Sequence, residues 1–348
     1  MRSGTGLEED EEQSVVVIPR GRPHRKLRKG DVVEVRPAAE ILATLDDKGC
    51  LDGVPFMPEM LQHVGCRFAV DARVERACDT IGYSGARKMA DAVLLGDLRC
   101  DGTGHDGCQA GCRLYWKEAW LRRVGEEPGE RQSEQRESPL GDAHATLADL
   151  SRATATVTRE GSPIYRCQAT EFVRATTSMG WFDPRSFINE VTCGNVGIVQ
   201  FLRVTTRLVL EESARRLRIF RDPVRPRGDG DAGSRPDQKP LNLKAGDLVQ
   251  VRTQSEIEST LEASLKNRGL LFDREMVPYC GETRRVLARV DRFIDDRTGK
   301  MIELKSDCVI LDGAYCRGYV SRGRWFCPRQ IYSFWRESWL RPYDDRAQ

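Results

Sequence analysis

Three cysteines and a histidine fall within one short glycine-rich stretch, CDGTGHDGCQAGC at positions 100–112. Thiolate sulfur and imidazole nitrogen are the ligands that tetrahedral Zn²⁺ prefers, and a set of three cysteines and one histidine is common in structural zinc sites. The intervening glycines allow the backbone to fold around an ion. The sequence therefore predicts a zinc site whose ligands are Cys100, His105, Cys108 and Cys112.

Other chemistry at this stretch stays open. Iron–sulfur clusters need cysteines at a similar density, so an Fe–S centre is the alternative cofactor. A loop whose cysteines only pack against their neighbours is the third interpretation. The chain matches GxGxxG only inside the cysteine-rich stretch (102–107) and a polar stretch (228–233), not directly after a strand, and it has no Walker A, HExxH or GxSxG motif. It contains four histidines. The sequence therefore assigns no catalytic residue and leaves open whether the protein is an enzyme.

An internal duplication relates the two ends of the chain. The stretch LRKGDVVEVR at 27–36 matches LKAGDLVQVR at 243–252, and WKEAWL at 116–121 matches WRESWL at 335–340. Between these anchors, Glu59-Met60 falls on Glu275-Met276. Self-similarity of this kind indicates repeated structural units. The sequence predicts two copies of one domain, at 27–124 and 241–345.

The cysteines of the two copies correspond only in part. Cys66, Cys100 and Cys108 have the counterparts Cys280, Cys316 and Cys327, whereas His105 and Cys112 have none, and Ile331 stands in the place of Cys112. Cys78 belongs to the first copy alone and Cys308 to the second. Two interpretations stay open: a local site in the first copy alone, or a second metal site whose candidate ligands are Cys280, Cys308, Cys316 and Cys327.

The elements that would position these ligands are short strands. Apolar residues alternate or cluster at 32–35, 67–74, 92–98 and 114–122, and a helical turn or two is expected at 40–45. The fold class predicted is α+β and mostly β, with two small antiparallel barrels or sandwiches flanking a helical middle segment. In that segment, Asp183-Pro184 is a typical helix start.

A second middle helix is expected from 196 to 216. Its apolar residues follow one face and its arginines another: Ile198, Phe201, Leu202, Leu208 and Val209 against Arg203, Arg207, Arg215 and Arg216. Three polar stretches divide the chain, at 1–26, 125–143 and 222–240. Their composition indicates a disordered tail and two linkers. The domains predicted are therefore 27–124, a helical segment at 144–221, and 241–345.

Two resemblances add expectations. KGDVVEV at 29–35 resembles the first strand of SH3-like barrels of the KOW and Tudor type. This resemblance implies modules that bind proteins or nucleic acids. The signature that runs from CDG at 100–102 to WKEAWL at 116–121 resembles uncharacterised bacterial hypothetical proteins. That second resemblance implies a bacterial origin and no function.

Composition narrows the class of protein. The 348 residues carry 55 Lys and Arg against 53 Asp and Glu, and this near balance argues against a histone-like polyanion binder. No apolar run approaches the roughly 18–20 residues that a membrane span needs, and the N-terminus does not read as a signal peptide. We expect a cytoplasmic protein with reduced thiols and no membrane association.

The function favoured by the sequence is a zinc-stabilised tandem adaptor without catalytic activity, acting on a protein partner. Two alternatives remain. One is a metal-dependent or Fe–S-dependent enzyme that uses the Cys100–Cys112 loop. The other is a nucleic-acid-binding protein that uses the barrels and the arginine-rich helix.

Overall fold

The computed structural model describes eight segments of the chain: residues 25–125, 147–157, 161–180, 183–216, 226–228, 241–305, 307–321 and 324–343. The expected tail and the two expected linkers fall almost wholly outside them. The exception within the second linker is 226–228, where the Arg227 N–H donates to Glu258 Oε1 at 3.1 Å. In the described part of the chain, no helix combines the length and the apolar character that a bilayer span requires.

The first module is a curled antiparallel sheet in the strand order β8-β7-β4-β1-β9. Its strands are β1 (Val32–Val35), β4 (Arg67–Arg73), β7 (Ala92–Arg99), β8 (Arg113–Lys117) and β9 (Leu121–Arg123). The short elements around it are α1 (Ala38–Leu42), β2 (Cys50–Leu51), β3 (Val54–Pro55), the 3₁₀ helices η1 (Pro58–His63) and η2 (Glu118–Trp120), and the β5 (Ala77–Cys78) and β6 (Ala86–Lys88) pair.

The second module repeats this order as β20-β19-β16-β13-β21, which confirms the duplication. Its strands are β13 (Leu248–Val251), β16 (Thr283–Arg289), β19 (Cys308–Tyr315), β20 (Tyr332–Arg336) and β21 (Leu340–Pro342). Around them lie α6 (Gln254–Glu258), β14 (Lys266–Asn267), β15 (Leu270–Leu271), η5 (Arg274–Tyr279), the β17 (Arg292–Ile294) and β18 (Met301–Glu303) hairpin, and η6 (Glu337–Trp339). The strand registers match as well, since Val32 opposes Ala69 and Leu248 opposes Arg285.

Paired tryptophans form the centre of each core. Trp116 and Trp120 in the first module, and their counterparts in the second, are completely buried. The Trp120 indole N–H donates to Thr44 Oγ1 at 3.0 Å, and the Trp339 indole donates to Thr260 Oγ1 at the same distance. The same tryptophan rings are buried in both modules, and the equivalent indole N–H groups donate to equivalent threonines. The two cores are therefore built in the same way.

The predicted strand at 114–122 is wrong in one respect. The chain leaves β8 at Lys117, makes the single 3₁₀ turn η2, and re-enters the sheet at the opposite edge as β9. This turn curls the sheet, because β8 and β9 become its two edge strands. The helical turn expected at 40–45 begins earlier, at Ala38, directly after Pro37.

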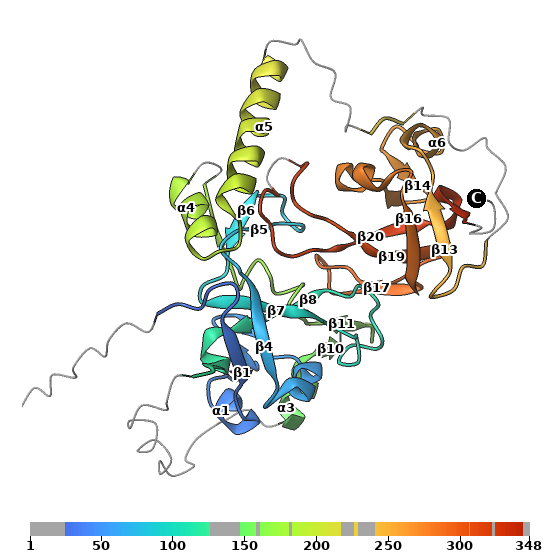
Figure 1. Cartoon of the computed structure of the whole chain (residues 1–348). Helices are drawn as coiled ribbons and strands as arrows, with labels where there is room; N and C mark the ends of the chain where they lie inside the picture. Colours follow the sequence, from blue (N-terminus) through green and yellow to red (C-terminus); the bar gives the residue numbers. More distant parts are fainter. Residues whose placement is uncertain are drawn as a thin grey trace, which may run out of the picture.

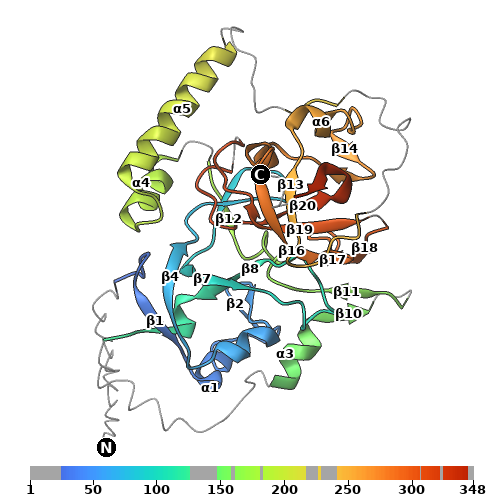
Figure 2. The same ribbon diagram turned by 45° about the vertical axis from the view of Figure 1, so that its right-hand side comes forward.

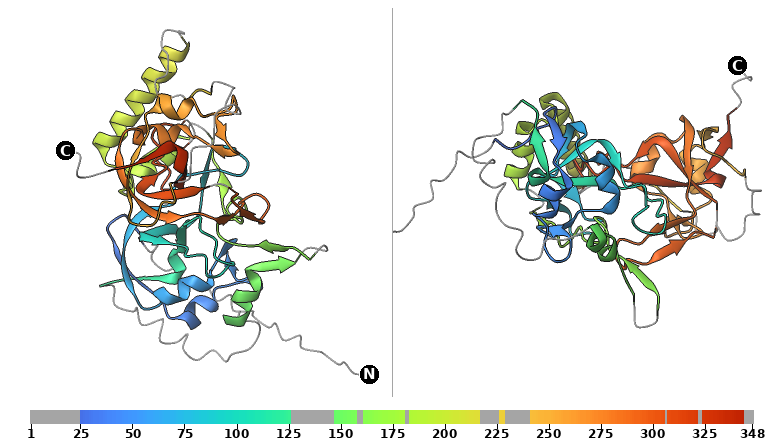
Figure 3. Two further views of the ribbon diagram at one scale, coloured as in Figure 1. Left: turned by 90° about the vertical axis from the view of Figure 1, so that its right-hand side faces the viewer. Right: turned by 90° about the horizontal axis from the view of Figure 1, so that it is seen from below.

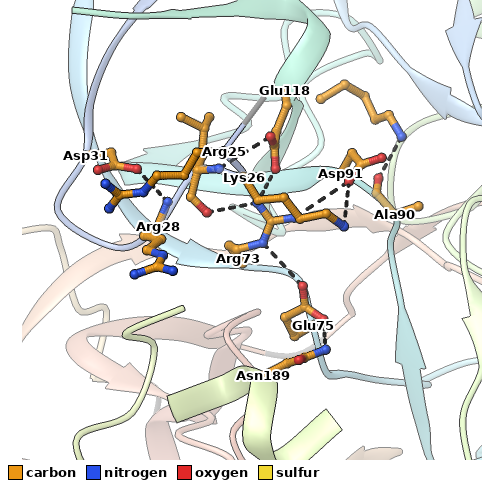
Figure 4. Close-up of polar contacts among 12 residues, drawn as sticks. Arg25, Lys26, Arg28, Asp31, Arg73, Glu75, Ala90, Asp91, Glu118 and Asn189 are labelled. Atoms are coloured by element: carbon orange, nitrogen blue, oxygen red, sulfur yellow. Dashed lines mark hydrogen bonds and ion pairs between the residues drawn. The ribbon is translucent and has the colours of Figure 1, made fainter. Parts of the chain in front are cut away.

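An arginine in each module pairs with a glutamate near the end of that module, and in the first module this arginine is buried. Figure 4 shows Arg73 between the carboxylates of Glu75 and Glu118, with its Nη1 also donating to Leu27 O at 2.8 Å. In the second module, Arg289 Nη1 donates to Glu337 Oε1 at 2.9 Å. Charge-assisted hydrogen bonds of this kind satisfy buried polar groups that would otherwise destabilise the fold.

The middle segment packs mainly against the first module. It contains α3 (Leu147–Ala153), the β10 (Ala155–Val157) and β11 (Pro163–Tyr165) hairpin, β12 (Thr177–Ser178), which pairs with β6, and the helices α4 (Pro184–Thr192) and α5 (Ile198–Arg216). The predicted helix start is confirmed, because the Asp183 carboxylate accepts from the Arg185 N–H at 3.0 Å.

Helix α5 stands away from both sheets, at the top of Figures 1 and 2. Of its expected apolar face, Phe201 packs on Phe187 and Phe326, whereas Ile198, Leu202 and Val209 are exposed. The helix therefore does not bury the apolar face that its sequence pattern suggested.

The two modules meet along one joint (Figures 1 and 3). The Cys100–Cys112 loop of the first module lies against β17 of the second: Gln109 Oε1 accepts from the Asp291 and Arg292 N–H groups at 2.6 and 3.0 Å. Beside it, the Tyr165 N–H donates to Gly299 O at 2.8 Å, so the middle segment joins the same contact.

Glu190 on α4 gives the fold a pH-dependent element. Its side chain is fully buried, and the Asn195 amide donates to its Oε2 at 2.8 Å. Burial, reinforced by the Glu75 carboxylate and opposed by Asn195 and Arg76, raises the pKa of Glu190 to about 8. The folded state therefore keeps a proton that the unfolded chain releases above its ordinary pKa of 4.5.

We expect stability to fall as pH rises from about 5 to 8, by up to about 1.4 kcal/mol per pH unit from this group, and to fall no further from it above pH 8. Glu190→Gln removes the titration and should unfold at higher urea concentration than the wild type at pH 8, with the difference shrinking toward pH 5. The exposed Glu303→Gln is the matched control. Parallel pH profiles for Glu190→Gln and wild type would contradict the assignment.

Candidate metal centre

The Cys100–Cys112 loop is a closed turn at the end of the first sheet. The Cys100 N–H donates to Cys112 O at 2.8 Å, and inside this closure the Cys108 N–H donates to His105 O at 3.2 Å. Gly102 has φ +78°, and a Cβ there would lie 2.1 Å from Cys108 O. Only glycine fits such an approach, so the loop depends on the glycines noted in the sequence.

The Glu59 side chain, which comes from η1, lies beside the loop residues Cys100 and His105. Glu59 is buried, and the Cys100 thiol donates to its Oε1 at 3.2 Å. His105 Nε2 lies 4.0 Å from the same oxygen. One potential ligand atom from each of these three residues lies within 4.8 Å of the other two. Among the described residues this is the one cluster of acidic, cysteine and histidine side chains close enough to hold a metal ion.

Two polar atoms of the cluster are buried without a hydrogen-bond partner among the described residues. They are Glu59 Oε2 and His105 Nδ1. Buried polar atoms are almost always satisfied, so an orphaned carboxylate oxygen and an orphaned imidazole nitrogen in one cluster are unusual. Carboxylate, thiolate and imidazole are together a ligand set that Zn²⁺ accepts.

The structure brings together two of the four ligands that the sequence predicted, Cys100 and His105. Cys108 and Cys112 are not in the cluster. The Cys108 sulfur instead accepts from the Ile294 N–H of the second module at 3.4 Å. Glu59 was missed as a ligand because no spacing rule links it to the loop. The available signal was its match to Glu275 between the copies.

A small cavity of about 40 Å³ adjoins the cluster. Its walls include the cluster itself and both remaining loop cysteines, together with Cys167 and Asp296. Such a volume holds one or a few water molecules, or an ion with little else. Burial, with the Glu59 carboxylate beside it, raises the pKa of the Cys100 thiol far above its usual range, and burial does the same for Cys112.

The second module has a loop with the same backbone hydrogen bonds, but an arginine takes the place of His105. There the Cys316 N–H donates to Ile331 O at 2.8 Å and the Cys327 N–H to Arg324 O at 3.0 Å, which are the two bonds that shape the first loop. Arg324 therefore stands in the place of His105. Its guanidinium donates to Asp273 Oδ2 at 2.8 Å and lies 3.9 Å from Cys316 Sγ.

The glutamate is repeated too. Glu275 occupies the place of Glu59, and its Oε1 accepts from the Val320 and Ser321 N–H groups at 2.9 and 2.5 Å. A fixed guanidinium thus supplies positive charge to the second loop, where the first loop has the His105 imidazole and two orphaned atoms.

The four thiols proposed for a second metal site are not gathered at one point. Cys308 packs with Val290 and Ile310, and Cys280 lies against the second core, whereas Cys327 packs into the first core. All twelve cysteines lie in the described part of the chain as free thiols.

Comparison of the chain with protein-family models, with curated proteins and with solved structures finds no match.

Proposed function

We propose that this protein is a metal-binding tandem adaptor, in which a zinc ion held by Glu59, Cys100 and His105 fixes the joint between its two β modules. The observation that carries the proposal is a difference between the two copies. In the second copy Arg324 places a cation in the loop, whereas in the first copy the loop has the half-buried Cys100, the buried Glu59 and His105, and two orphaned atoms. An ionised carboxylate buried away from water needs a compensating positive charge.

A structural role for the ion is supported by where its ligands lie. The same loop carries Gln109, which pairs with the backbone of β17 in the second module. Holding the loop against η1 would therefore hold the two modules in one arrangement. A nucleophilic role for Cys100 is disfavoured, because burial and a neighbouring carboxylate oppose the thiolate that such chemistry requires.

A protein partner is favoured over nucleic acid. Helix α5 exposes the apolar side chains Ile198, Val199, Leu202, Val209 and Leu210. Exposed apolar groups on one projecting helix are typical of surfaces that contact proteins. A nucleic-acid partner would require binding that weakens steeply with salt, and that measurement separates the two.

Elemental analysis of protein purified without chelators tests the metal site. We expect about one zinc per chain, because three protein ligands and one further group complete a tetrahedral site. Cys100→Ser, His105→Ala and Glu59→Gln should each reduce bound zinc at least about tenfold, in line with loss of a ligand. Cys193→Ser, which removes a buried thiol elsewhere, is the matched control. Cys108→Ser reports whether the fourth ligand is a thiolate.

Elemental analysis also tests the second candidate function, an enzyme that contains an iron–sulfur cluster. Four thiols line the cavity, namely Cys100, Cys108, Cys112 and Cys167, and four cysteines can hold an iron–sulfur cluster. Iron with acid-labile sulfide and visible absorption would favour this centre and an enzymatic role. Protein that is free of metal after anaerobic purification and does not take up added zinc would refute both.

A further inference from the structure

Two further thiols, those of Cys78 and Cys327, lie where the two modules meet, away from the metal cluster. Cys78 ends β5 in the first module, and Cys327 lies in the loop before β20 of the second, which reaches back to β5 (Figure 1). The Cys78 N–H donates to Cys327 Sγ at 3.1 Å, and the two thiols also hydrogen-bond to each other. The pair joins positions 249 residues apart in the sequence.

The buried Arg329 and the half-buried Arg324 lie close to this pair. Arg329 Nη1 donates to Cys78 O at 2.8 Å, and its guanidinium lies over the Phe172 ring at 4.3 Å from the centroid. The hydrogen bond from Cys327, helped by the Arg329 and Arg324 guanidiniums, lowers the pKa of Cys78 even though the residue is buried. A lowered pKa increases the fraction of thiolate, which is the form of a thiol that reacts.

Cys78, though not Cys327, lines a cavity that could admit a small molecule. A cavity of about 200 Å³ is lined by Cys78 and by Cys316, together with Thr80, Asp273 and Tyr332. Hydrogen peroxide is little larger than water and fits such a space. Cys316, the other thiol on its wall, is disfavoured as the reacting group, because burial and the Glu275 carboxylate raise its pKa to about 12.

We propose that Cys78 and Cys327 are a peroxide-reactive dithiol whose oxidation links the two modules through a disulfide. The Cys78 thiolate attacks one oxygen of the peroxide, which forms Cys78 sulfenic acid and releases hydroxide. The Cys327 thiol then attacks the sulfenic sulfur, so that the S–S bond forms and the sulfenic oxygen leaves as water once the Cys327 proton is counted. Two thiols are oxidised and one peroxide is reduced to two waters.

This inference is independent of the metal site. Neither thiol belongs to the Glu59, Cys100 and His105 cluster. The linkage would lock the same joint that the ion is proposed to hold, but it does so covalently and reversibly, since a thiol reductant restores the pair.

Peptide mapping of the full-length protein tests the proposal. Reduced protein is exposed to a small excess of hydrogen peroxide, alkylated and digested without reductant. We expect one linked peptide that contains Cys78 and Cys327, and its disappearance after dithiothreitol. Cys78→Ser and Cys327→Ser should each abolish it completely, whereas Cys193→Ser should leave it unchanged. An unaltered circular dichroism spectrum and urea midpoint under reducing conditions show that a variant has folded.

Other outcomes overturn the proposal. Recovery of both cysteines as separate alkylated thiols, after peroxide has oxidised other cysteines, would show that the pair does not react. A Cys78 to Cys316 linkage would show that the wrong partner was assigned, and Cys316→Ser distinguishes this case. Sulfinic acid on Cys78 with intact Cys327 would show that no resolving thiol is in reach.

Discussion

Arg324→His is expected to give the second module a metal site of its own. The substitution removes the guanidinium that now occupies the loop and places an imidazole where the first module has His105. Cys316 and Glu275 already stand in the places of Cys100 and Glu59, and Asp273, released from Arg324, offers a further carboxylate. Bound zinc should rise from about one ion per chain to about two, because the ligand types then match those of a tetrahedral site.

The matched control is Arg324→Gln, which removes the same charge without adding a ligand that zinc prefers. It should leave the zinc content at the wild-type value. Zinc titration followed by equilibrium dialysis measures both variants. If Arg324→His binds no more zinc than Arg324→Gln, the two loops are alike in backbone only. Arg324 would then not be evidence that a metal ion occupies the first loop.

The sheets of both modules could be predicted from the sequence because local patterns determine them. Gly-Asp turns followed by valines at 30–35 give β1, and the repeat of the same pattern at 246–251 gives β13. The tryptophan pairs were visible for the same reason. The interruption at η2 was not, because Trp116 and Trp120 are four residues apart, a spacing that would also place them on one side of a continuous strand. Only closure of the curled sheet requires the turn between Lys117 and Leu121.

The metal cluster could be predicted only in part. Cys100 and His105 lie close together because the glycine loop is local, so their spacing carried the information. Glu59 comes from η1, 41 residues earlier, and its approach to Cys100 depends on how η1 packs under the sheet. Cys108 belongs to the same local loop but lies outside the cluster. Its sulfur accepts from the Ile294 N–H, and that contact exists only because the second module packs against the loop.

The joint itself was beyond the reach of sequence patterns. Cys78 and Cys327 have no shared motif, and their contact follows from the way the loop before β20 folds back onto β5. Helix α5 shows the same limit, since its periodicity predicts an apolar face but not whether the chain itself covers that face. Contacts between modules depend on tertiary arrangement, which local periodicity does not encode.

Arg329→Met is expected to loosen this joint more than any surface change. Arg329 is 5% exposed, and its Nη1 donates to Cys78 O at 2.8 Å and to Thr80 Oγ1 at 3.0 Å. Its Nη2 lies 3.9 Å from the partly exposed Asp296 carboxylate. Methionine fills similar space but leaves the buried Cys78 carbonyl without its donor, and each hydrogen bond to a charged group contributes about 1.5–3 kcal/mol.

We therefore expect the free energy of unfolding to fall by about 3 kcal/mol or more. Because Arg329 bridges the modules, a single urea transition should also separate into two as the modules begin to unfold independently. Arg297→Met, on the exposed turn of the neighbouring hairpin, is the control and should change stability by less than about 0.5 kcal/mol. If Arg329→Met stays that close to wild type, the contacts of Arg329 do not hold the joint, and the modules must be held together by the Gln109 pairing and the loop that carries it.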